Sequence, residues 1–202
     1  MPQFSIIVPV YNRVDEVDDL LKSLTEQSCM DFEVVLVEDG STVRCEKCVN
    51  RYNDRLSIQY YYKENEGRSI ARNYGLERAK ADYFIFFDSD CVIPKDYFKI
   101  LKGELERNFT DCFGGPDAAH DSFSDVQKAI NYSMTSFLTT GGIRGGKVNL
   151  EKFVPRTFNM GFSRKVYNAV GGFREMFSED IDMSTRISQA GFSIGLINSA
   201  YV

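Results

Sequence analysis

Several features are missing from this chain of 202 residues, and each absence excludes a class of protein. No apolar run approaches the roughly 20 residues that a membrane-spanning helix needs. The first apolar run, Phe4 to Val10, is short and is typical of a strand rather than of a signal peptide. A formal net charge of −5 gives no basic surface for nucleic acid. We therefore expect neither a membrane span nor nucleic-acid binding.

Cysteine and histidine are also scarce. The five cysteines are odd in number and scattered, which argues against a disulfide framework. Cys45 and Cys48 form a lone CxxC pair with no second pair or histidine near it, so a zinc site is not expected. The single histidine, His120, is predicted to lie in a surface loop. Free thiols favour a reducing, cytoplasmic compartment.

Two common nucleotide-binding loops are absent as well. A dinucleotide-binding Rossmann fold has GxGxxG after its first strand, but this chain has Pro9 to Arg13 there, so NAD binding is not expected. Residues 141–147 match GxxxxGK, yet Val148 stands where a P-loop needs a hydroxyl for Mg²⁺. We predict that Gly141 to Lys152 is a loop rather than a phosphate site.

What is present is an alternation of strands and helices. With 43% hydrophobic residues, the chain has enough apolar side chains for the core of a single domain. Strands are predicted at 4–10, 32–37, 56–62, 83–87, 111–115, 159–163 and 192–197, and helices at 14–28, 42–54, 66–80, 95–108, 124–137, 164–169 and 178–191. The β-α-β-α-β-α-β order of the first part predicts parallel strands joined by helical crossovers.

Carboxylates follow two of the predicted buried strands. Tyr83 to Phe87 leads directly into Asp88-Ser89-Asp90, and the strand ending at Val37 leads into Glu38-Asp39. Parallel strands present their carboxyl ends at one edge of the sheet, where ligands bind in open α/β folds. Asp88 and Asp90 point the same way in an extended chain. Two oxygen donors of this kind suit Mg²⁺ or Mn²⁺ shared with substrate phosphates, although on their own they are also typical of a surface turn.

Six short motifs occur together in a characteristic order. They are Ser5 to Asn12 (SIIVPVYN), Val34 to Ser41 (VVLVEDGS), Gly67 with Ala71 to Gly75 (ARNYG), Asp88-Ser89-Asp90, Gly171-Gly172-Phe173 and Glu179-Asp180. Together they resemble the family 2 glycosyltransferases of the GT-A fold. The resemblance covers nearly the whole chain and implies a Rossmann-like, mostly parallel sheet flanked by helices, with a smaller acceptor-side region.

The resemblance implies an inverting transfer of a sugar from a nucleotide diphosphate, typically UDP, to an acceptor hydroxyl. On the donor side it implies Pro9 and Tyr11 around the base, Asp39 bonded to the base, Arg72 on the nucleotide, Asp88 near the ribose and metal, and Asp90 on the metal. On the acceptor side it implies Asp180 as general base, with Glu179, Gly172 and Phe173 nearby. A carboxylate base is needed because the attacking hydroxyl must lose its proton.

The sequence departs from this family in one respect. Members usually carry a histidine after the last core strand that helps to hold the metal, and His120 is in the wrong place. We expect a single domain over 1–202, with a nucleotide-sugar half at 1–115 and an acceptor half at 116–202 that is truncated at its C-terminus. The expected acceptor is a carbohydrate or a lipid-linked sugar, reached at the inner face of the membrane through segments outside this sequence.

Two other functions remain open at this point. A catalytically silent nucleotide-sugar binding module would share the same motifs. A sugar nucleotidyltransferase would also use a Rossmann-like sheet, acids and Mg²⁺, but it would need a glycine-rich, arginine-bearing loop after the first strand. Pro9 to Arg13 does not provide that loop.

Overall fold

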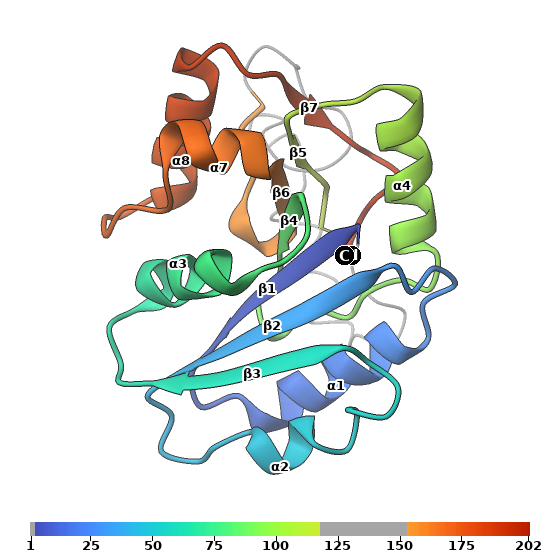
Figure 1. Ribbon diagram of the computed structural model, residues 1–202, viewed down its shortest axis with the longest axis vertical. Coiled ribbons are helices and arrows are strands. Elements are labelled where there is room, and N and C mark those ends of the chain that lie inside the picture. The colour runs from blue at the N-terminus through green and yellow to red at the C-terminus, as the bar shows by residue number, and fades with distance from the viewer. Residues whose placement is uncertain (1–2, 118–152) are drawn as a thin grey trace, which may run out of the picture.

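A computed structural model describes residues 3–117 and 153–202. Within these residues the chain forms a seven-stranded sheet with helices on both faces (Figure 1). The strands are β1 (Phe4–Val10), β2 (Phe32–Asp39), β3 (Ile58–Lys63), β4 (Tyr83–Phe86), β5 (Cys112–Gly114), β6 (Met160–Ser163) and β7 (Ile194–Leu196). The helices are α1 (Val14–Thr25), α2 (Glu46–Val49), α3 (Arg68–Arg78), α4 (Tyr97–Arg107), α7 (Arg164–Val170) and α8 (Glu179–Gln189), and a 3₁₀ turn spans Thr157–Asn159.

The strand order across the sheet is β3-β2-β1-β4-β6-β5-β7. The first four strands are parallel, as the alternation of strands and helices predicts, whereas β6 runs antiparallel to both β4 and β5. β1 pairs with β2 on one side and β4 on the other, with Ile7 opposite both Val35 and Phe86. The carboxyl ends of β1, β2 and β4 therefore meet at one edge of the sheet.

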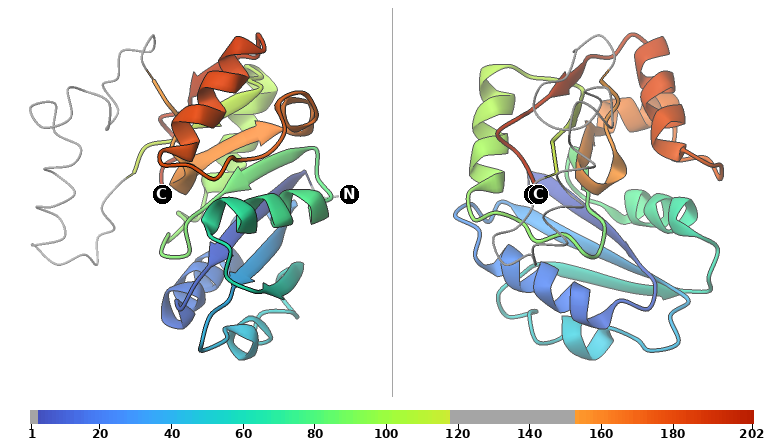
Figure 2. Two further views of the ribbon diagram at one scale, coloured as in Figure 1. Left: turned by 90° about the vertical axis from the view of Figure 1, so that its left-hand side faces the viewer. Right: turned by 180° about the vertical axis from the view of Figure 1, so that it is seen from behind.

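Side-chain alternation along the strands builds two cores. Ile6 and Val8 of β1 face one cluster, which α1, α2 and α4 cover, while Ile7 faces the other, which α3, α7 and α8 cover (Figure 2). All four residues of β4 are buried, so the aromatic run that precedes Asp88 is a central strand. Burying both faces of that strand fixes where the following acids emerge.

One predicted helix is shorter in the structure. Only Glu46–Val49 is α-helical within the predicted helix at 42–54, where polar side chains leave a weak apolar stripe. Asn12, in the loop before α1, has φ 54°, and its side chain accepts hydrogen bonds from the backbone N–H and hydroxyl of Thr42. Asn12 therefore ties the loop after β1 to the loop after β2. The predicted helix at 124–137 and the predicted loop at 141–152 lie outside the described residues, as does His120.

Candidate active site

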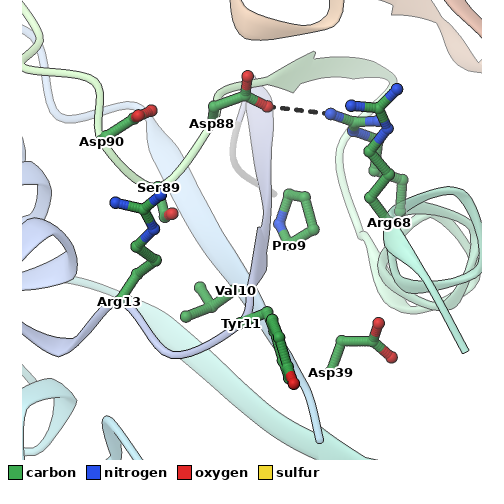
Figure 3. A pocket seen from close by; sticks show the side chains of 10 residues that line it. Pro9, Val10, Tyr11, Arg13, Asp39, Arg68, Asp88, Ser89 and Asp90 are labelled. Atoms are coloured by element: carbon green, nitrogen blue, oxygen red, sulfur yellow. Dashed lines mark hydrogen bonds and ion pairs between the residues drawn. The ribbon is translucent and has the colours of Figure 1, made fainter. Parts of the chain in front are cut away.

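A pocket of ≈ 240 Å³ opens at the edge where β1, β2 and β4 end. Its walls come from the loop after β1, the end of β2, the start of α3 and the loop after β4 (Figure 3). The lining residues are Pro9, Val10, Tyr11, Arg13, Asp39, Arg68, Arg72, Asp88, Ser89 and Asp90. All six residues that the sequence predicts on the donor side are among them.

The two aspartates after β4 are the open carboxylates of this pocket. One oxygen of Asp88 accepts a hydrogen bond of 2.9 Å from Arg72 Nη2, and 46% of the Asp88 side chain is exposed. Asp90 is exposed and, among the described residues, its carboxylate accepts no hydrogen bond. Together they present at least three carboxylate oxygens without a protein donor in the described part of the chain.

Asp39 is a closed carboxylate. It is the last residue of β2, and one oxygen accepts bonds from Lys63 Nζ (2.7 Å) and the Glu66 N–H (3.0 Å), while the other accepts from the Gly67 N–H (2.8 Å). These bonds fold the segment before α3 against the end of β2, with Gly67 at φ 94°. One lone pair on the second oxygen remains to meet a ligand.

Tyr11 lies at the mouth of the pocket. It is 53% exposed, and Figure 3 shows its ring on the same side of the pocket as Asp39. An exposed aromatic ring next to a buried hydrogen-bond acceptor is an arrangement that suits a flat, polar-edged base.

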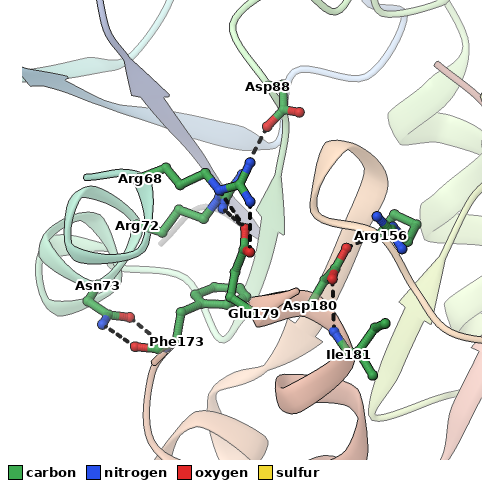
Figure 4. A network of polar contacts seen from close by, with 9 residues as sticks. All are labelled: Arg68, Arg72, Asn73, Asp88, Arg156, Phe173, Glu179, Asp180 and Ile181. Carbon is green, nitrogen blue, oxygen red and sulfur yellow. Dashed lines mark hydrogen bonds and ion pairs between the residues drawn. The ribbon is translucent and has the colours of Figure 1, made fainter. Parts of the chain in front are cut away.

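Arg72 connects this pocket to the second half of the chain. It is one of the largest fully buried side chains, and its terminal nitrogens donate to Asp88 (2.9 Å) and to Glu179 (3.0 Å). Arg68, one helical turn earlier, donates a hydrogen bond of 2.9 Å from Nη2 to one oxygen of Glu179, and its Nε forms an ion pair of 2.9 Å with the other (Figure 4). Burial disfavours the charged form of Glu179, but its backbone hydrogen bond and the two arginines outweigh burial and lower the pKa of Glu179.

Asp180 lies beside this network but is not among the pocket-lining residues. One of its oxygens contacts Arg156 Nε at 2.7 Å, and the other accepts a bond of 2.9 Å from the Ile181 N–H. Its side chain is 6% exposed. Ser178, two residues before Asp180, has φ 63°, a conformation that is strained for a residue other than glycine. The start of α8 is thus held in a specific, locally strained arrangement.

Gly172 and Phe173 form the turn that leads to α8. Asn73 donates to the Phe173 carbonyl (2.8 Å) and accepts from the Phe173 N–H (2.7 Å). A Cβ on Gly172 would lie 2.3 Å from Asn73 Oδ1, so only glycine fits this approach. The Phe173 ring is 4% exposed and packs edge-on against Phe86 at 5.0 Å between centroids. Phe173 is therefore a core residue that anchors the turn.

The described residues contain no cluster of three or more His, Cys, Asp or Glu side chains that could hold a metal ion. The pair Asp88 and Asp90 still fits Mg²⁺ or Mn²⁺, because these ions are commonly bound through one or two carboxylates, with substrate phosphates and water completing the shell. The free oxygens of this exposed pair are the donors that such a site requires.

A family model decides the relationship to known proteins. The model for glycosyl transferase family 2 matches residues 5–171. The chain belongs to glycosyl transferase family 2.

Other glycosyltransferases are similar to this chain in sequence. An uncharacterized glycosyltransferase of Rickettsia conorii is 33% identical over 144 residues, which are 70% of this chain and 23% of the relative. This family 2 chain therefore spans about a quarter of the length of that relative.

Solved structures confirm the expected GT-A fold. TarS of Staphylococcus aureus, in a complex with UDP-GlcNAc, has a TM-score of 0.75 and 24% identity over all of this chain and 58% of that one. A mannosyltransferase of Pyrobaculum calidifontis, in a complex with GDP-Man and Mn²⁺, has a TM-score of 0.75 and 19% identity over 99% of this chain and 56% of that one.

Four cations at or beside the pocket were not predicted from the sequence: Arg13, Arg68, Lys63 and Arg156. Arg68 was detectable, because it stands four residues before Arg72 on the same helix and so shares its face. Lys63 ends β3 and reaches Asp39 across two paired strands. Nothing in the sequence pairs Arg156 with Asp180, since these residues meet only when the turn before β6 packs beside α8.

No helix among the described residues is both long enough and apolar enough to cross a bilayer.

Proposed function

We propose that this domain transfers a sugar from a UDP-sugar to an acceptor hydroxyl with inversion at the anomeric carbon. The observation that carries the proposal is the pocket at the carboxyl edge of the sheet, where two open carboxylates, a closed carboxylate and an exposed tyrosine converge. Family membership supports the class of reaction. The complex of TarS with UDP-GlcNAc supports UDP as the nucleotide.

The donor base would lie between Tyr11, Pro9 and Asp39. The exposed Tyr11 ring can stack on a base, and one oxygen of Asp39 retains a lone pair that can accept a hydrogen bond from an N–H group of that base. Uracil offers such an N–H group between its two carbonyls. The backbone and lysine bonds of Asp39 keep that oxygen in place before the donor arrives, which lowers the entropy cost of binding.

A divalent metal ion is part of this proposal, with Asp88 and Asp90 as its protein ligands. Their exposure and free oxygens support it, as does the Mn²⁺ in the mannosyltransferase complex. When bound, the ion would offset the negative charge that develops on the leaving diphosphate. Arg68, which is 64% exposed in the same pocket, adds a fixed positive charge near that position.

Asp180 is proposed as the general base. The acceptor hydroxyl attacks the anomeric carbon on the face opposite the leaving diphosphate, so its proton must pass to a group outside the donor pocket. Asp180 is buried beside that pocket rather than in it, and Arg156 and the Ile181 N–H orient its carboxylate. Glu179, Gly172 and Phe173 belong to the same acceptor side through the turn that carries Asp180.

A carbohydrate or lipid-linked acceptor and a cytoplasmic location at the inner face of the membrane are parts of the same proposal. Nucleotide sugars supply the donor in that compartment, and the five cysteines are all free, as a reducing environment favours.

Nucleotide release tests the proposal. The full natural protein would be incubated with a panel of UDP-sugars and GDP-sugars with and without Mn²⁺, and free UDP or GDP would be measured. We expect UDP release from one UDP-sugar and stimulation by Mn²⁺. UDP binding without release from any donor, in the presence of candidate acceptors, would instead identify a binding module.

A further inference from the structure

Glu179 and Arg72 form an ionic bridge between the two halves of the chain. Glu179 and Arg72 are both 2% exposed in their side chains and lie 3.0 Å apart. Arg72 continues the bridge to Asp88, and Arg68 holds the second oxygen of Glu179. Figure 4 shows Asp88, Arg72 and Glu179 in one chain of contacts, with Asp180 next along the backbone.

Each end of this bridge lies at a residue that has a role in the proposed function or is adjacent to one. Asp88 lies in the donor pocket, and Asp180 directly follows Glu179 at the start of α8. The partners of Glu179 lie more than one hundred residues earlier in the chain. The bridge therefore sets a distance between two elements that no local interaction could set.

A second contact between the same elements reinforces the bridge. Asn73 of α3 forms two hydrogen bonds with the backbone of Phe173, and the Arg72 guanidinium lies 5.7 Å from the centre of the Phe173 ring. Helix α3 thus contacts the segment before Asp180 at two places, namely Phe173 in the turn and Glu179 directly before Asp180.

We propose that Glu179 and Arg72 are positioning residues, which place the Asp180 carboxylate relative to the donor held at Asp88. This inference rests on the proposed function. The resemblance implies nucleotide contact for Arg72 and either orientation of Asp180 or acceptor contact for Glu179, and the bridge favours orientation for both residues. Both terminal nitrogens of Arg72 already donate to carboxylates, and both oxygens of Glu179 already accept from arginines. Arg72 also donates to one oxygen of Asp88, which leaves the other oxygen without a donor in the described part of the chain.

Two substitutions test the bridge while preserving size. Glu179→Gln removes the charge, and Arg72→Lys keeps the charge but loses the planar fork that reaches two carboxylates. In the full natural protein we expect either change to lower kcat for UDP release by about 10- to 100-fold, the typical cost of a misplaced group. For Glu179→Gln, the KM for the UDP-sugar and the Kd for UDP should change by less than about 3-fold, because Glu179 is not among the residues that line the pocket.

A double substitution separates positioning from independent catalysis. If Glu179 acts through Asp180, then adding Glu179→Gln to Asp180→Asn should lower kcat no further, as residues that act as a unit are not additive. If the double substitution lowers kcat by the product of the two single effects, the proposal is overturned. A large rise in the KM for the UDP-sugar at unchanged kcat would also overturn it. The matched control is Arg164→Lys, which breaks arginine bonds to the Ala79 and Ala81 carbonyls at the opposite edge of the sheet and should leave kcat unchanged.

Amide hydrogen exchange tests the bridge without turnover. Glu179→Gln should accelerate exchange at residues 173–183 and leave β1 and β2 unchanged, because only the docking of α8 on α3 is weakened. Unchanged exchange at 173–183 would overturn the bridge even in an active enzyme. If the wild-type protein releases no nucleotide and Glu179→Gln still shows this local acceleration, the results contradict the proposed function and support the bridge.

Discussion

The acids after β4 and the acids at the start of α8 differ in how the protein treats them. Asp88 and Asp90 are exposed or half-exposed, with oxygens that have no donor in the described part of the chain. Glu179 and Asp180 are nearly buried, and every oxygen has a partner. Open acids suit a ligand that arrives from solution, whereas closed acids suit a fixed geometry. This difference supports our proposals that the first pair binds the donor and a metal ion and that the second pair serves orientation and proton transfer.

The largest effect in this comparison is expected at Asp180. Asp180→Asn keeps the size and most hydrogen bonds of the side chain but removes the base. We expect kcat to fall by about 10²–10⁴-fold, the usual contribution of general-base catalysis, while UDP affinity stays unchanged. Steady-state UDP release and calorimetric UDP titration measure the two quantities. Equal turnover in variant and wild type would remove Asp180 as the base.

The open pair should show the reverse behaviour. Asp90→Ala removes an exposed ligand without leaving a buried partner, so folding stability should change by no more than about 0.5 kcal/mol. UDP affinity in the presence of Mn²⁺ should fall by about tenfold or more, while affinity without Mn²⁺ should hardly change. Calorimetric titrations with and without Mn²⁺ provide the check. A loss of affinity that is equal in both conditions contradicts a metal role.

The turn before the closed pair should be sensitive to one methyl group. Gly172→Ala places a Cβ 2.3 Å from Asn73 Oδ1, which must move or break its bonds to Phe173. We expect a loss of about 1–3 kcal/mol in the free energy of unfolding, as for other overpacked sites. Urea denaturation measures it. Gly103→Ala in α4, where nothing lies within 4 Å of the added methyl, is the control and should be neutral or stabilising.

The smallest expected effect is the pH dependence of Glu179. Its pKa is lowered in the folded chain, so its ionised form stabilises the fold fully above the ordinary glutamate pKa of about 4.3. That stabilisation is lost as the pH falls from there through the lowered folded value. The difference in unfolding free energy between wild type and Glu179→Gln should therefore be constant near neutral pH and shrink in acid. A difference that stays constant in acid would show that Glu179 contributes no charge-dependent stability.

The local sequence pattern was sufficient for most of the fold. Short apolar or β-rich runs, separated by helical patterns, predicted β1 to β4 and their parallel order, and the structure confirms both. The antiparallel direction of β6 could not be predicted, because the four residues of this strand (MGFS) carry no signal for their direction relative to β4. The helix predicted at 42–54 was wrong in extent because its residues have no clear apolar stripe.

The candidate site was partly predictable for a related reason. Acids at the ends of adjacent parallel strands must lie at one edge, so Asp39, Asp88 and Asp90 could be grouped from the sequence. Which of these carboxylates are bound by protein donors and which are open could not be predicted in the same way. Lys63 and the Gly67 backbone close Asp39, while Asp90 stays open, and both facts depend on how neighbouring segments fold back onto the strand ends.

The sequence by itself determined the strands, the edge of the sheet where the acids gather and the family to which the chain belongs. These follow from side-chain periodicity and short motifs, which are local properties. Only the tertiary structure decided which carboxylates are free and which are bound. The arginines that hold Glu179 lie more than one hundred residues away from it, and only the docking of α3 beside α8 brings their charges within hydrogen-bonding distance.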